Sequence, residues 1–377
     1  MLLIFNAGSS SLRFTLFEEK NGTKDDLKQL YRGHIDALGL KTCHFRRYLG
    51  RGEEKQNPLK IKTHAEATKY ALERLISDGA ILAAADIKTI GHRVVHGGAS
   101  YRTATQINAK VIKDIEALSP LAPLHNPANL AVIKSAQKLF PKAKNYAVFD
   151  TAFYADLPQK AFLYGLPYAL YTKDKIRRYG FQGTSHSFVA GQAARLLKKP
   201  LKSLALITCH IGNGISITAI KNGKAVDTTM GFTPLEGPMM GTRSGTVDPG
   251  IVLHLMKKFA RANAVEKVEN LLQKESGFLG LSGIGSDIRA LHARPKSEGT
   301  LRTFDVFSYQ MAKLILSFLA PLGRLPDAII FTAGIGENAP YLRKQICAYL
   351  NPFMAKVKIL VIHTDEELEI ARQIAKR

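Results

Sequence analysis

The sequence predicts a two-domain α/β protein made by duplication of one domain. The chain has 377 residues, more than one ordinary domain needs, and 46% of them are hydrophobic. A β-prone run, a short polar turn and a second β-prone run occupy residues 2–17, and the same pattern returns after Leu204. Such recurrence indicates a repeated domain, although two unrelated hairpins would leave the same trace.

Strands open the first half, and a helix follows them. We expect strands at Leu2–Phe5 and Leu12–Phe17 around a turn at Asn6–Ser11, because the apolar residues have the spacing of strands. Residues 63–86 carry apolar side chains at helical spacing and should form a helix.

Each half also contains an apolar strand that ends in a glycine turn. The first strand leads to Arg93 and Gly97–Gly98, and the second leads to Gly334 and Gly336. Glycine permits a ligand to approach the backbone closely. Because these paired features follow the same order in both halves, they favour duplication over coincidence.

The middle of the chain contains an acidic residue at a strand end. After a helix expected at about 128–139, an apolar strand leads to Asp150. Ligands bind beyond the carboxyl ends of strands, so Asp150 is a site candidate, but capping of the next turn would explain it equally well. Residues 158–180 look irregular and mark the domain junction, and a helix capped by Thr184 or Ser185 should follow.

The second half should be mainly helical over 248–275 and 302–323, with a Gly/Ser loop between these segments. A last strand ends at Thr364–Asp365, where a final helix with an acidic first turn is capped.

Composition restricts the class of protein. No apolar run approaches the roughly 18–20 residues that span a bilayer, and the three cysteines lie far apart, so a cytoplasmic protein without disulfides or zinc is expected. The formal net charge is +22, but Lys and Arg are scattered and do not alternate with aromatic residues. The charge therefore predicts attraction of anionic substrates rather than nucleic-acid binding.

Several segments could bind phosphate. Loops rich in Gly, Ser and Asn lie at 6–11, 210–214, 231–245 and 334–338, and their backbone N–H groups can donate to phosphate oxygens. There is no Walker A sequence and no GxGxxG motif after the first strand, which excludes the common nucleotide-binding loops.

Two arginines distinguish this chain from a generic nucleotide binder. Arg93 and Arg243 both lie on glycine-flanked turns, and phosphoryl transfer needs positive charge around the moving group, together with a metal. Either arginine alone could be an ordinary salt-bridge residue. Together, and with Asp150 as a candidate metal ligand, they favour a phosphotransferase. His186 and His210 lack partners at metal-ligand spacing and are interpreted as hydrogen-bonding structural residues.

Ten motifs, found in order along almost the whole chain, resemble the acetate kinase family. They are NAGSSSLRF (6–14), GHRVVHGG (91–98), PLHNP (123–127), FDTAF (149–153), RRYGFQGTSH (177–186), HIGNG (210–214), DTTMGFTPLEGPMMGTRSG (227–245), ESGFLGLSGIGSDIR (275–289), TAGIGENAP (332–340) and HTDEELEIAR (363–372).

The resemblance implies a duplicated ribonuclease H-like fold, as in actin and hexokinase, with an interdomain cleft. The domains would be 1–153 and 154–367, with a C-terminal helix at 368–377 that packs on the first domain. It further implies a homodimer that transfers phosphate reversibly from ATP to acetate, giving acetyl phosphate and ADP, with Mg²⁺ or Mn²⁺.

The resemblance also implies roles for individual residues. Catalytic roles fall to Asp150, Arg243, Gln182 and Arg93, of which Arg93 would bind the acetate carboxylate and Arg243 the transferring phosphoryl group. The metal ligands would be Asn6, Asp150 and Glu366. The acyl pocket would be lined by Val95, Leu124, Phe181 and Pro234. The nucleotide would contact Arg13, His210, Ile211, Gly212, Asn213, Gly214, Asp287, Ile288, Arg289, Gly334, Ile335, Gly336, Glu337 and Asn338.

The chain departs from the family pattern at four places. Gln182 replaces a histidine that would stabilise the transition state, so we expect slower turnover and little pH dependence from this position. Arg13 replaces a lysine and keeps its charge, and Thr246 replaces a common acidic residue. A loop usually found before the last strand is shortened near 351–356.

Three alternatives stay open at the sequence level. The first is a propionate or butyrate kinase of the same fold, although the four bulky pocket residues favour acetate by a modest margin. The second is an acetate kinase that uses pyrophosphate. The third is a catalytically weakened nucleotide-binding protein of the actin fold.

Overall fold

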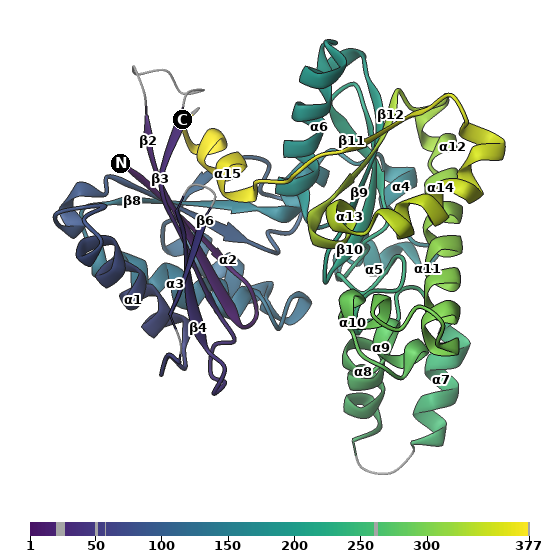
Figure 1. The fold of residues 1–377 in the computed structure, drawn as a ribbon, viewed down its shortest axis with the longest axis horizontal. Coiled ribbons are helices and arrows are strands. Elements are labelled where there is room, and N and C mark those ends of the chain that lie inside the picture. The colour runs from purple at the N-terminus through teal and green to yellow at the C-terminus, as the bar shows by residue number, and fades with distance from the viewer. Residues whose placement is uncertain (20–26, 50–51, 57, 260–262, 376–377) are drawn as a thin grey trace. The chain divides into compact units, whose positions relative to one another are not determined.

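The computed structural model describes residues 1–19, 27–49, 52–56, 58–259 and 263–375. Contacts divide the chain into two units (Figure 1). Unit 1 comprises Met1–Ala155 and Asp365–Arg377, and unit 2 comprises Asp156–Thr364. None of the helices in the described part of the chain has the length and apolar character of a membrane span.

Unit 1 is built on an eight-stranded sheet with the order β5-β4-β3-β2-β1-β6-β8-β7. Strands β1 to β5 follow one another as antiparallel neighbours, whereas β6 runs parallel to both β1 and β8. The strands are β1 (Leu2–Ala7), β2 (Ser11–Glu19), β3 (Leu27–Asp36), β4 (His44–Leu49), β5 (Gly52–Gln56), β6 (Thr89–Val94), β7 (Thr105–Gln106) and β8 (Lys144–Phe149).

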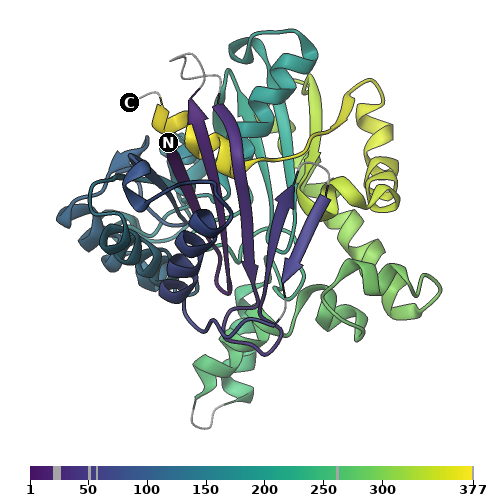
Figure 2. The same ribbon diagram turned by 60° about the vertical axis from the view of Figure 1, so that its left-hand side comes forward.

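Helices cover both faces of this sheet (Figure 2). Alternate residues of β1 point to opposite sides, as strand geometry requires. Leu3 and Phe5 pack with α1 (His64–Ser77) and α3 (Asn126–Leu139). Leu2 and Ile4 pack instead with α15 (Glu366–Ala375). Helix α2 (Ala109–Ala117) packs beside α3. Because both faces are covered, β1 is buried along its whole length.

Unit 2 contains a five-stranded sheet with the order β11-β10-β9-β12-β13. Its strand order and directions repeat those of β3-β2-β1-β6-β8, with an antiparallel hairpin on one side and parallel partners on the other. The repeat predicted from the two hairpin patterns is therefore confirmed. The strands are β9 (Ala205–Ile211), β10 (Ile215–Lys221), β11 (Lys224–Thr228), β12 (Ala328–Thr332) and β13 (Lys358–Val361).

Each repeat is followed in the sequence by a helix that packs on the sheet of the other repeat. Helix α6 (Gly183–Leu197) follows the β8 segment of unit 1 but packs on β9 and β12. Helix α15 follows β13 but packs on β1 and β6. The remaining helices are α4 (Gln159–Phe162), α5 (Tyr168–Thr172), α7 (Pro249–Lys258), α8 (Ala264–Lys274), α9 (Gly277–Ser282), α10 (Ile288–His292), α11 (Glu298–Ser317), α12 (Leu319–Leu322), α13 (Ala333–Asn338) and α14 (Pro340–Met354).

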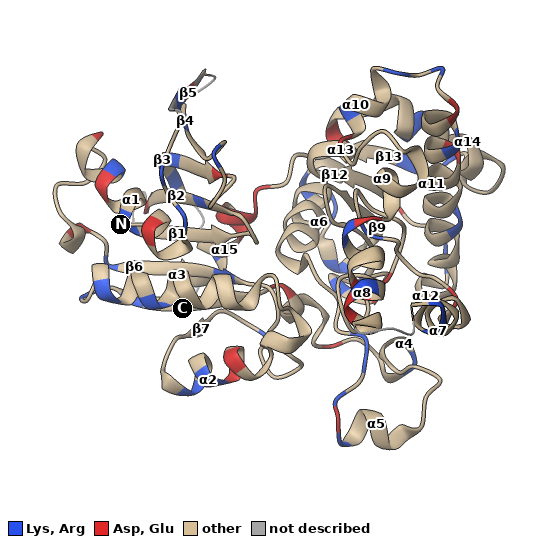
Figure 3. Ribbon diagram, turned by 90° about the horizontal axis from the view of Figure 1, so that it is seen from below, with Lys and Arg blue, Asp and Glu red and all other residues tan. Residues whose placement is uncertain are grey.

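Some expected element boundaries were wrong. The helix expected over 63–86 ends at Ser77, because Gly79 adopts a left-handed conformation (φ +70°) that terminates it. The Gly/Ser loop expected after residue 275 is interrupted by α9 and α10, and the loop at 334–338 is the short helix α13. Strands β3 to β5 had no clear signal in the sequence. Lys and Arg are distributed over the elements of both units (Figure 3).

Candidate active site

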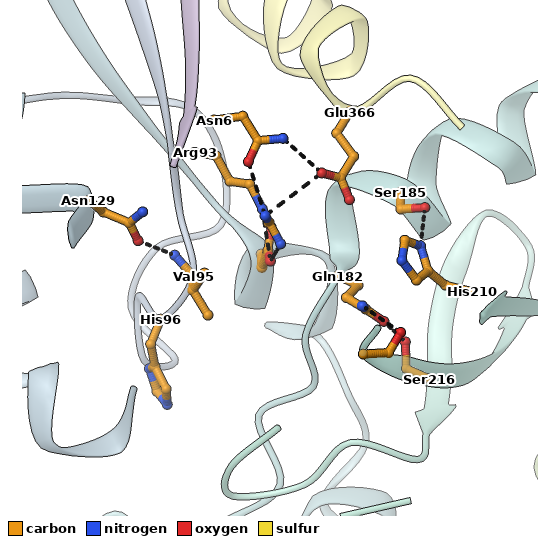
Figure 4. A network of polar contacts seen from close by, with 12 residues as sticks. Asn6, Arg93, Val95, His96, Asn129, Gln182, Ser185, His210, Ser216 and Glu366 are labelled. Atoms are coloured by element: carbon orange, nitrogen blue, oxygen red, sulfur yellow. Dashed lines mark hydrogen bonds and ion pairs between the residues drawn. The ribbon is translucent and has the colours of Figure 1, made fainter. Parts of the chain in front are cut away.

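Four polar residues from separate segments gather in unit 1. Asn6 lies near the end of β1, Arg93 near the end of β6 and Asp150 directly after β8, while Glu366 begins α15. Strands β1, β6 and β8 are adjacent, with β6 parallel to the other two, so their carboxyl ends meet at one edge of the sheet. Figure 4 shows Asn6, Arg93 and Glu366 directed toward one another at this edge.

Arg93 is the centre of this cluster. Its Nε and Nη2 donate to Oδ1 and Oδ2 of Asp150 at 3.0 and 2.7 Å, and its Nη1 donates to Oδ1 of Asn6 at 3.0 Å. Nη1 also lies 3.8 Å from Oε2 of Glu366. The Asn6 amide nitrogen donates to Oε2 of Glu366 at 3.0 Å and to Oε1 of Glu367 at 2.7 Å. Glu367 therefore belongs to the cluster, although the sequence analysis gave it no role.

The electrostatics of the cluster keep Arg93 charged. Burial alone would lower the pKa of its guanidinium, but Asp150, Glu366 and Glu367 raise that pKa above its ordinary value. Only 1% of the Asp150 side chain is exposed. Three carboxylates face Arg93, and Arg32 lies 3.8 Å from Oε2 of Glu367. The cluster has more negative than positive groups, so it can accept a further cation.

The oxygen donors of this cluster suit a hard metal ion. Carboxylate and amide oxygens are the ligands that Mg²⁺ prefers, and Mg²⁺ commonly takes only one or two carboxylates together with water and phosphate. Within the described ranges, no three His, Cys, Asp or Glu side chains form a group that would hold a metal unaided. The donor set at Asn6, Asp150 and Glu366 therefore fits a metal whose remaining ligands come from substrate phosphate and water.

Two buried asparagines hold the segment that follows β6. Asn129 accepts from the Val95 backbone N–H at 3.1 Å and donates to the Ala7 carbonyl oxygen at 3.0 Å. Asn126 accepts from the His96 N–H and donates to the His96 carbonyl oxygen, both at 3.0 Å. Val95 is buried by this arrangement. Sequence reasoning missed both asparagines, although a pair of amide residues in the first turn of α3, after a proline-rich turn, was a usable signal.

The expected acyl-pocket residues are divided equally between the units. Val95 and Leu124 belong to unit 1, whereas Phe181 and Pro234 belong to unit 2. Val95 and Phe181 are buried, but Leu124 is 44% exposed.

In unit 2, two side-chain nitrogen atoms lie close to one glycine at the end of the β9–β10 turn. A methyl group placed on Gly214 would lie 3.2 Å from Nε2 of Gln182 and 3.7 Å from Nη1 of Arg243. Glycine leaves this space open beside the turn. The amide of Gln182 and the guanidinium of Arg243 therefore converge on the backbone of the HIGNG segment.

Arg243 has no carboxylate partner among the described residues, in contrast to Arg93. Its Nη1 donates to the Pro234 carbonyl oxygen at 3.3 Å and lies 3.8 Å from the sulfur of Met240. Burial lowers the pKa of Arg243. A partly buried arginine without an acidic partner is a strong candidate for binding an anion.

The loop that carries Pro234 is held by a partly buried ion pair. Arg178 donates through Nη2 to Glu236 at 2.8 Å and through Nη1 to the Thr228 carbonyl oxygen at 2.7 Å. The Tyr164 hydroxyl donates to Glu236 and accepts from the Phe232 N–H. Thr246, which replaces a common acidic residue, closes the other end of the loop by donating and accepting hydrogen bonds with the Gly237 backbone.

Gln182 occupies an unusual backbone position at the start of α6. Its φ of 60° and ψ of 25° lie in the left-handed region, and it is the N-cap residue of the helix. The expectation that Thr184 or Ser185 caps α6 was therefore wrong. Both lie inside the first turn, where the Ser185 hydroxyl bonds to Nδ1 of His210 at 2.7 Å. His210 is thus held by a hydrogen bond, as expected.

The two repeats place comparable polar residues at the same strand position. Asn6 is the penultimate residue of β1, and His210 is the penultimate residue of β9. Asn6 bonds to Glu366 at the start of α15, and His210 bonds to Ser185 at the start of α6. Each hairpin is thus tied to the helix that the other repeat contributes.

The remaining expected nucleotide residues lie on short helices or the hairpin. Asp287 caps α10 and pairs with Arg289 at 2.7 Å, and both side chains are exposed. Glu337 accepts from the backbone N–H groups of Ala333 and Thr364, so its carboxylate stabilises the chain between β12 and α15. Arg13 pairs with Asn6 in the β1–β2 register and is exposed. Ile288 is buried in α10. Ile211 is the last residue of β9, Gly212 and Asn213 lie in the turn before β10, and Gly334, Ile335, Gly336 and Asn338 lie in α13.

Comparisons with known proteins agree over the whole chain. A family model described as the acetokinase family matches residues 1–354. An acetate kinase from Clostridium beijerinckii is 41% identical over 400 residues, covering 99% of this chain and 98% of that protein. Acetate kinase from Porphyromonas gingivalis has a similar structure, with a TM-score of 0.86, 35% identity and coverage of 98% of this chain and 97% of that chain. A propionate kinase from Francisella tularensis gives a TM-score of 0.89, also at 35% identity, with coverage of 99% and 98%.

Proposed function

The chain belongs to the acetokinase family, and on that premise we propose that it transfers a phosphoryl group reversibly between ATP and acetate, giving acetyl phosphate and ADP. It is a kinase whose acceptor is a carboxylate. The observation that carries the proposal is the convergence of Arg243 and Gln182 on Gly214, because it offers two nitrogen donors beside a turn suited to phosphate.

Acetate needs no general base. Its carboxylate is ionised at neutral pH, so an oxygen lone pair can attack the γ-phosphorus directly. The new O–P bond forms as the bond from phosphorus to the β–γ bridging oxygen breaks, and ADP leaves with that electron pair. Asp150 accordingly acts by orienting groups, not by removing a proton. Its double hydrogen bond fixes the plane of the Arg93 guanidinium.

Arg93 is proposed to bind the acetate carboxylate. Its positive charge is maintained by three neighbouring carboxylates, so it can attract the acetate anion. Asn6 and Glu366 limit the positions that the guanidinium can take. Positioning of this kind accounts for large rate effects when a reacting group is held in the productive geometry.

Mg²⁺ or Mn²⁺ would be held by Asn6, Asp150 and Glu366. When bound, the metal neutralises charge on the phosphate oxygens. In this cluster the protein supplies oxygen donors that already contact one another through Arg93 and Asn6, which supports the assignment.

Arg243 and Gln182 are proposed to bind the phosphoryl group during transfer. Arg243 supplies positive charge, and Gln182 supplies a neutral N–H donor. The backbone at His210–Gly214 would bind the ATP phosphates, and Asp287–Arg289 with Gly334–Asn338 would bind adenosine. We further propose a cytoplasmic homodimer, as the family resemblance implies.

Trapping of acetyl phosphate with hydroxylamine tests the function. The protein, ATP, Mg²⁺ and acetate should yield acetyl hydroxamate, and omission of the metal should abolish the product. Nucleotide binding without any product would support a weakened binding protein instead. Replacing ATP with pyrophosphate tests the donor, and we expect no product.

Parallel assays with propionate and butyrate test the acceptor. This comparison matters because a propionate kinase is among the similar structures. We expect the highest kcat/KM with acetate, and a higher value with propionate would reverse the assignment.

A further inference from the structure

A chain of short hydrogen bonds runs from the core of unit 2 to Gln182. Thr208 in β9, His186 in α6 and Ser216 in β10 are all buried. The two ring nitrogens of His186 contact hydroxyl groups on both sides, Nδ1 at 2.6 Å from Thr208 Oγ1 and Nε2 at 2.7 Å from Ser216 Oγ. Ser216 Oγ then lies 2.5 Å from Oε1 of Gln182, a contact drawn in Figure 4.

A donor and an acceptor can be assigned to each hydrogen bond of this network. Burial, assisted by His210, lowers the pKa of His186 well below its ordinary value, so its ring is neutral and carries one proton. The Gly214 carbonyl oxygen can only accept, and it lies 3.4 Å from Nε2 of Gln182, which leaves Oε1 facing Ser216. Ser216 therefore donates to Gln182 and accepts from the Nε2–H of His186. The Thr208 hydroxyl has two possible acceptors, Nδ1 of His186 at 2.6 Å and the Thr218 carbonyl oxygen at 3.4 Å, and the shorter contact assigns its proton to Nδ1.

From this arrangement we propose that Ser216 is a positioning residue for phosphoryl transfer. Its hydroxyl fixes the side-chain amide of Gln182 with the NH₂ group toward Gly214 and Arg243, and the carbonyl oxygen away from them. This proposal rests on the proposed function of Gln182 as a donor to the phosphoryl group. It names the residue that gives the amide its direction.

The direction of the amide decides whether Gln182 helps or hinders. The terminal torsion of glutamine is broad and roughly two-fold, so both orientations are sterically accessible. With its NH₂ group toward the site, the amide donates to phosphate oxygen. With its carbonyl oxygen there, it repels the same oxygen. The Ser216 hydroxyl donates to Oε1 when His186 donates to it through Nε2, and it then selects the useful orientation.

The backbone of Gln182 supports a functional reason for its position. A non-glycine residue in the left-handed region carries backbone strain, which persists only where the surrounding structure enforces it. Glycine would remove that strain, yet this position carries a long amide side chain at φ 60°. The strain is explained if the side chain is required beside Gly214.

A double-mutant cycle tests the proposal in the full-length protein. Ser216→Ala removes the donor, and we expect kcat to fall about 5- to 10-fold while KM for acetate and for ATP changes less than 2-fold. In a Gln182→Ala background, Ser216→Ala should lower kcat less than 2-fold further, because the oriented amide is already gone. Ser216→Thr keeps the hydroxyl and should restore most of the rate.

Thr218→Val is the matched control. Thr218 is equally buried, lies two residues further along β10 and bonds to Thr228 instead of Gln182. This variant should lose stability, measured by urea unfolding, without a comparable loss of kcat and without coupling to Gln182→Ala. Equal and additive losses of kcat from Ser216→Ala in both backgrounds would overturn the proposal.

A spectroscopic measurement separates this proposal from the catalytic role of Gln182. In protein labelled with ¹⁵N-glutamine, the side-chain signal absent from Gln182→Ala identifies the Gln182 amide. That signal should shift in Ser216→Ala and stay in place in Thr218→Val. An unshifted signal contradicts the orientation by Ser216. A shifted signal together with unchanged kcat in Gln182→Ala would instead refute the proposed role of Gln182.

Discussion

Arg93 and Asp150 form a bidentate ion pair, in which Nε donates to Oδ1 at 3.0 Å and Nη2 donates to Oδ2 at 2.7 Å. Asp150 is almost fully buried, and 16% of the Arg93 side chain is exposed. The plane of the guanidinium is therefore fixed before any substrate binds. Removal of either partner should affect both stability and catalysis.

We expect Asp150→Asn to inactivate the enzyme and destabilise it. In the variant, the charge of the partly buried Arg93 loses its carboxylate partner. Breaking a buried ion pair in this way costs about 3 kcal/mol of unfolding free energy. Misplacement of Arg93 should also lower kcat about 100-fold or more. Hydroxamate formation and urea unfolding measure the two effects.

Glu116→Gln provides the control for this variant. Glu116 forms an ion pair with Lys134 at 2.6 Å, but about half of each side chain is exposed. Exposed pairs contribute less than about 1 kcal/mol. If Glu116→Gln lost as much stability as Asp150→Asn, the buried Arg93–Asp150 pair would contribute no more to the unfolding free energy than an exposed pair.

The sequence predicted the repeat better than the local boundaries. Apolar strands and glycine turns recur in both halves, so β1, β6, β9 and β12 could be recognised from periodicity alone. The first residue of α6 could not be predicted in this way. A left-handed glutamine has no sequence signature, whereas Thr184 and Ser185 are common N-cap residues, so the usual rule placed the cap two or three residues too late.

The contacts between the site residues could not be predicted from the sequence either. Motifs singled out Asn6, Arg93, Asp150 and Glu366, but the sequence does not reveal which strands are adjacent. The parallel placement of β6 between β1 and β8 creates the Arg93–Asp150 contact. The catalytic roles of these residues stay predictions, and Asp150→Asn tests the Arg93–Asp150 contact.

Gln182→His should accelerate transfer. A protonated imidazole donates a charge-assisted hydrogen bond, roughly twice as strong as one from a neutral amide, and a gain of about 1.4 kcal/mol in the transition state corresponds to a tenfold rate. The variant should be fastest below the imidazole pKa and slow down as rising pH removes the charge. The parent glutamine should contribute no such slope. A rate equal to or below that of the parent at every pH would disprove this account.

Gly214→Ala should separate catalysis from stability. The added methyl would lie 3.2 Å from Nε2 of Gln182, so this amide must shift by a few tenths of an ångström, and it would occupy the space beside Nη1 of Arg243 at 3.7 Å. We expect kcat to fall about 10-fold or more, with a change of less than about 1 kcal/mol in unfolding free energy. Gly191→Ala in α6 meets no atom within 4 Å and should leave kcat unchanged while stabilising the protein by about 0.5–1 kcal/mol.

Val95→Ala should relax the preference for acetate. Removing two methyl groups makes room for the extra methylene of propionate, which is worth about 1–3 kcal/mol in an apolar pocket. We expect kcat/KM for propionate relative to acetate to rise roughly 5- to 10-fold. Val132→Ala removes the same volume from the core beside α3 and should destabilise the protein without changing this ratio. If both variants change the ratio equally, Val95 does not line the acyl site.

His92 should make the stability of the protein sensitive to acid. It is buried in β6, its Nε2 donates to Oδ1 of Asn145 at 2.8 Å, and it stacks on Phe5. Burial lowers its pKa to about 4, while the bond to Asn145 partly opposes the shift. Above pH 6.5 the imidazole is neutral in both the folded and unfolded states and contributes no pH dependence. As the pH falls from 6.5 toward 4, the unfolded state binds the proton first, so stability decreases.

The loss attributable to His92 over this interval should be about 3 kcal/mol, since each unit of pKa difference corresponds to about 1.4 kcal/mol. His92→Gln should therefore lose less stability than the parent between pH 7 and pH 4. Urea unfolding followed by circular dichroism at a series of pH values measures the difference, because the chain has no tryptophan for fluorescence. His254→Gln, at an exposed position in α7, should follow the parent curve. Parallel curves for His92→Gln and the parent would mean that His92 is protonated equally in the folded and unfolded states.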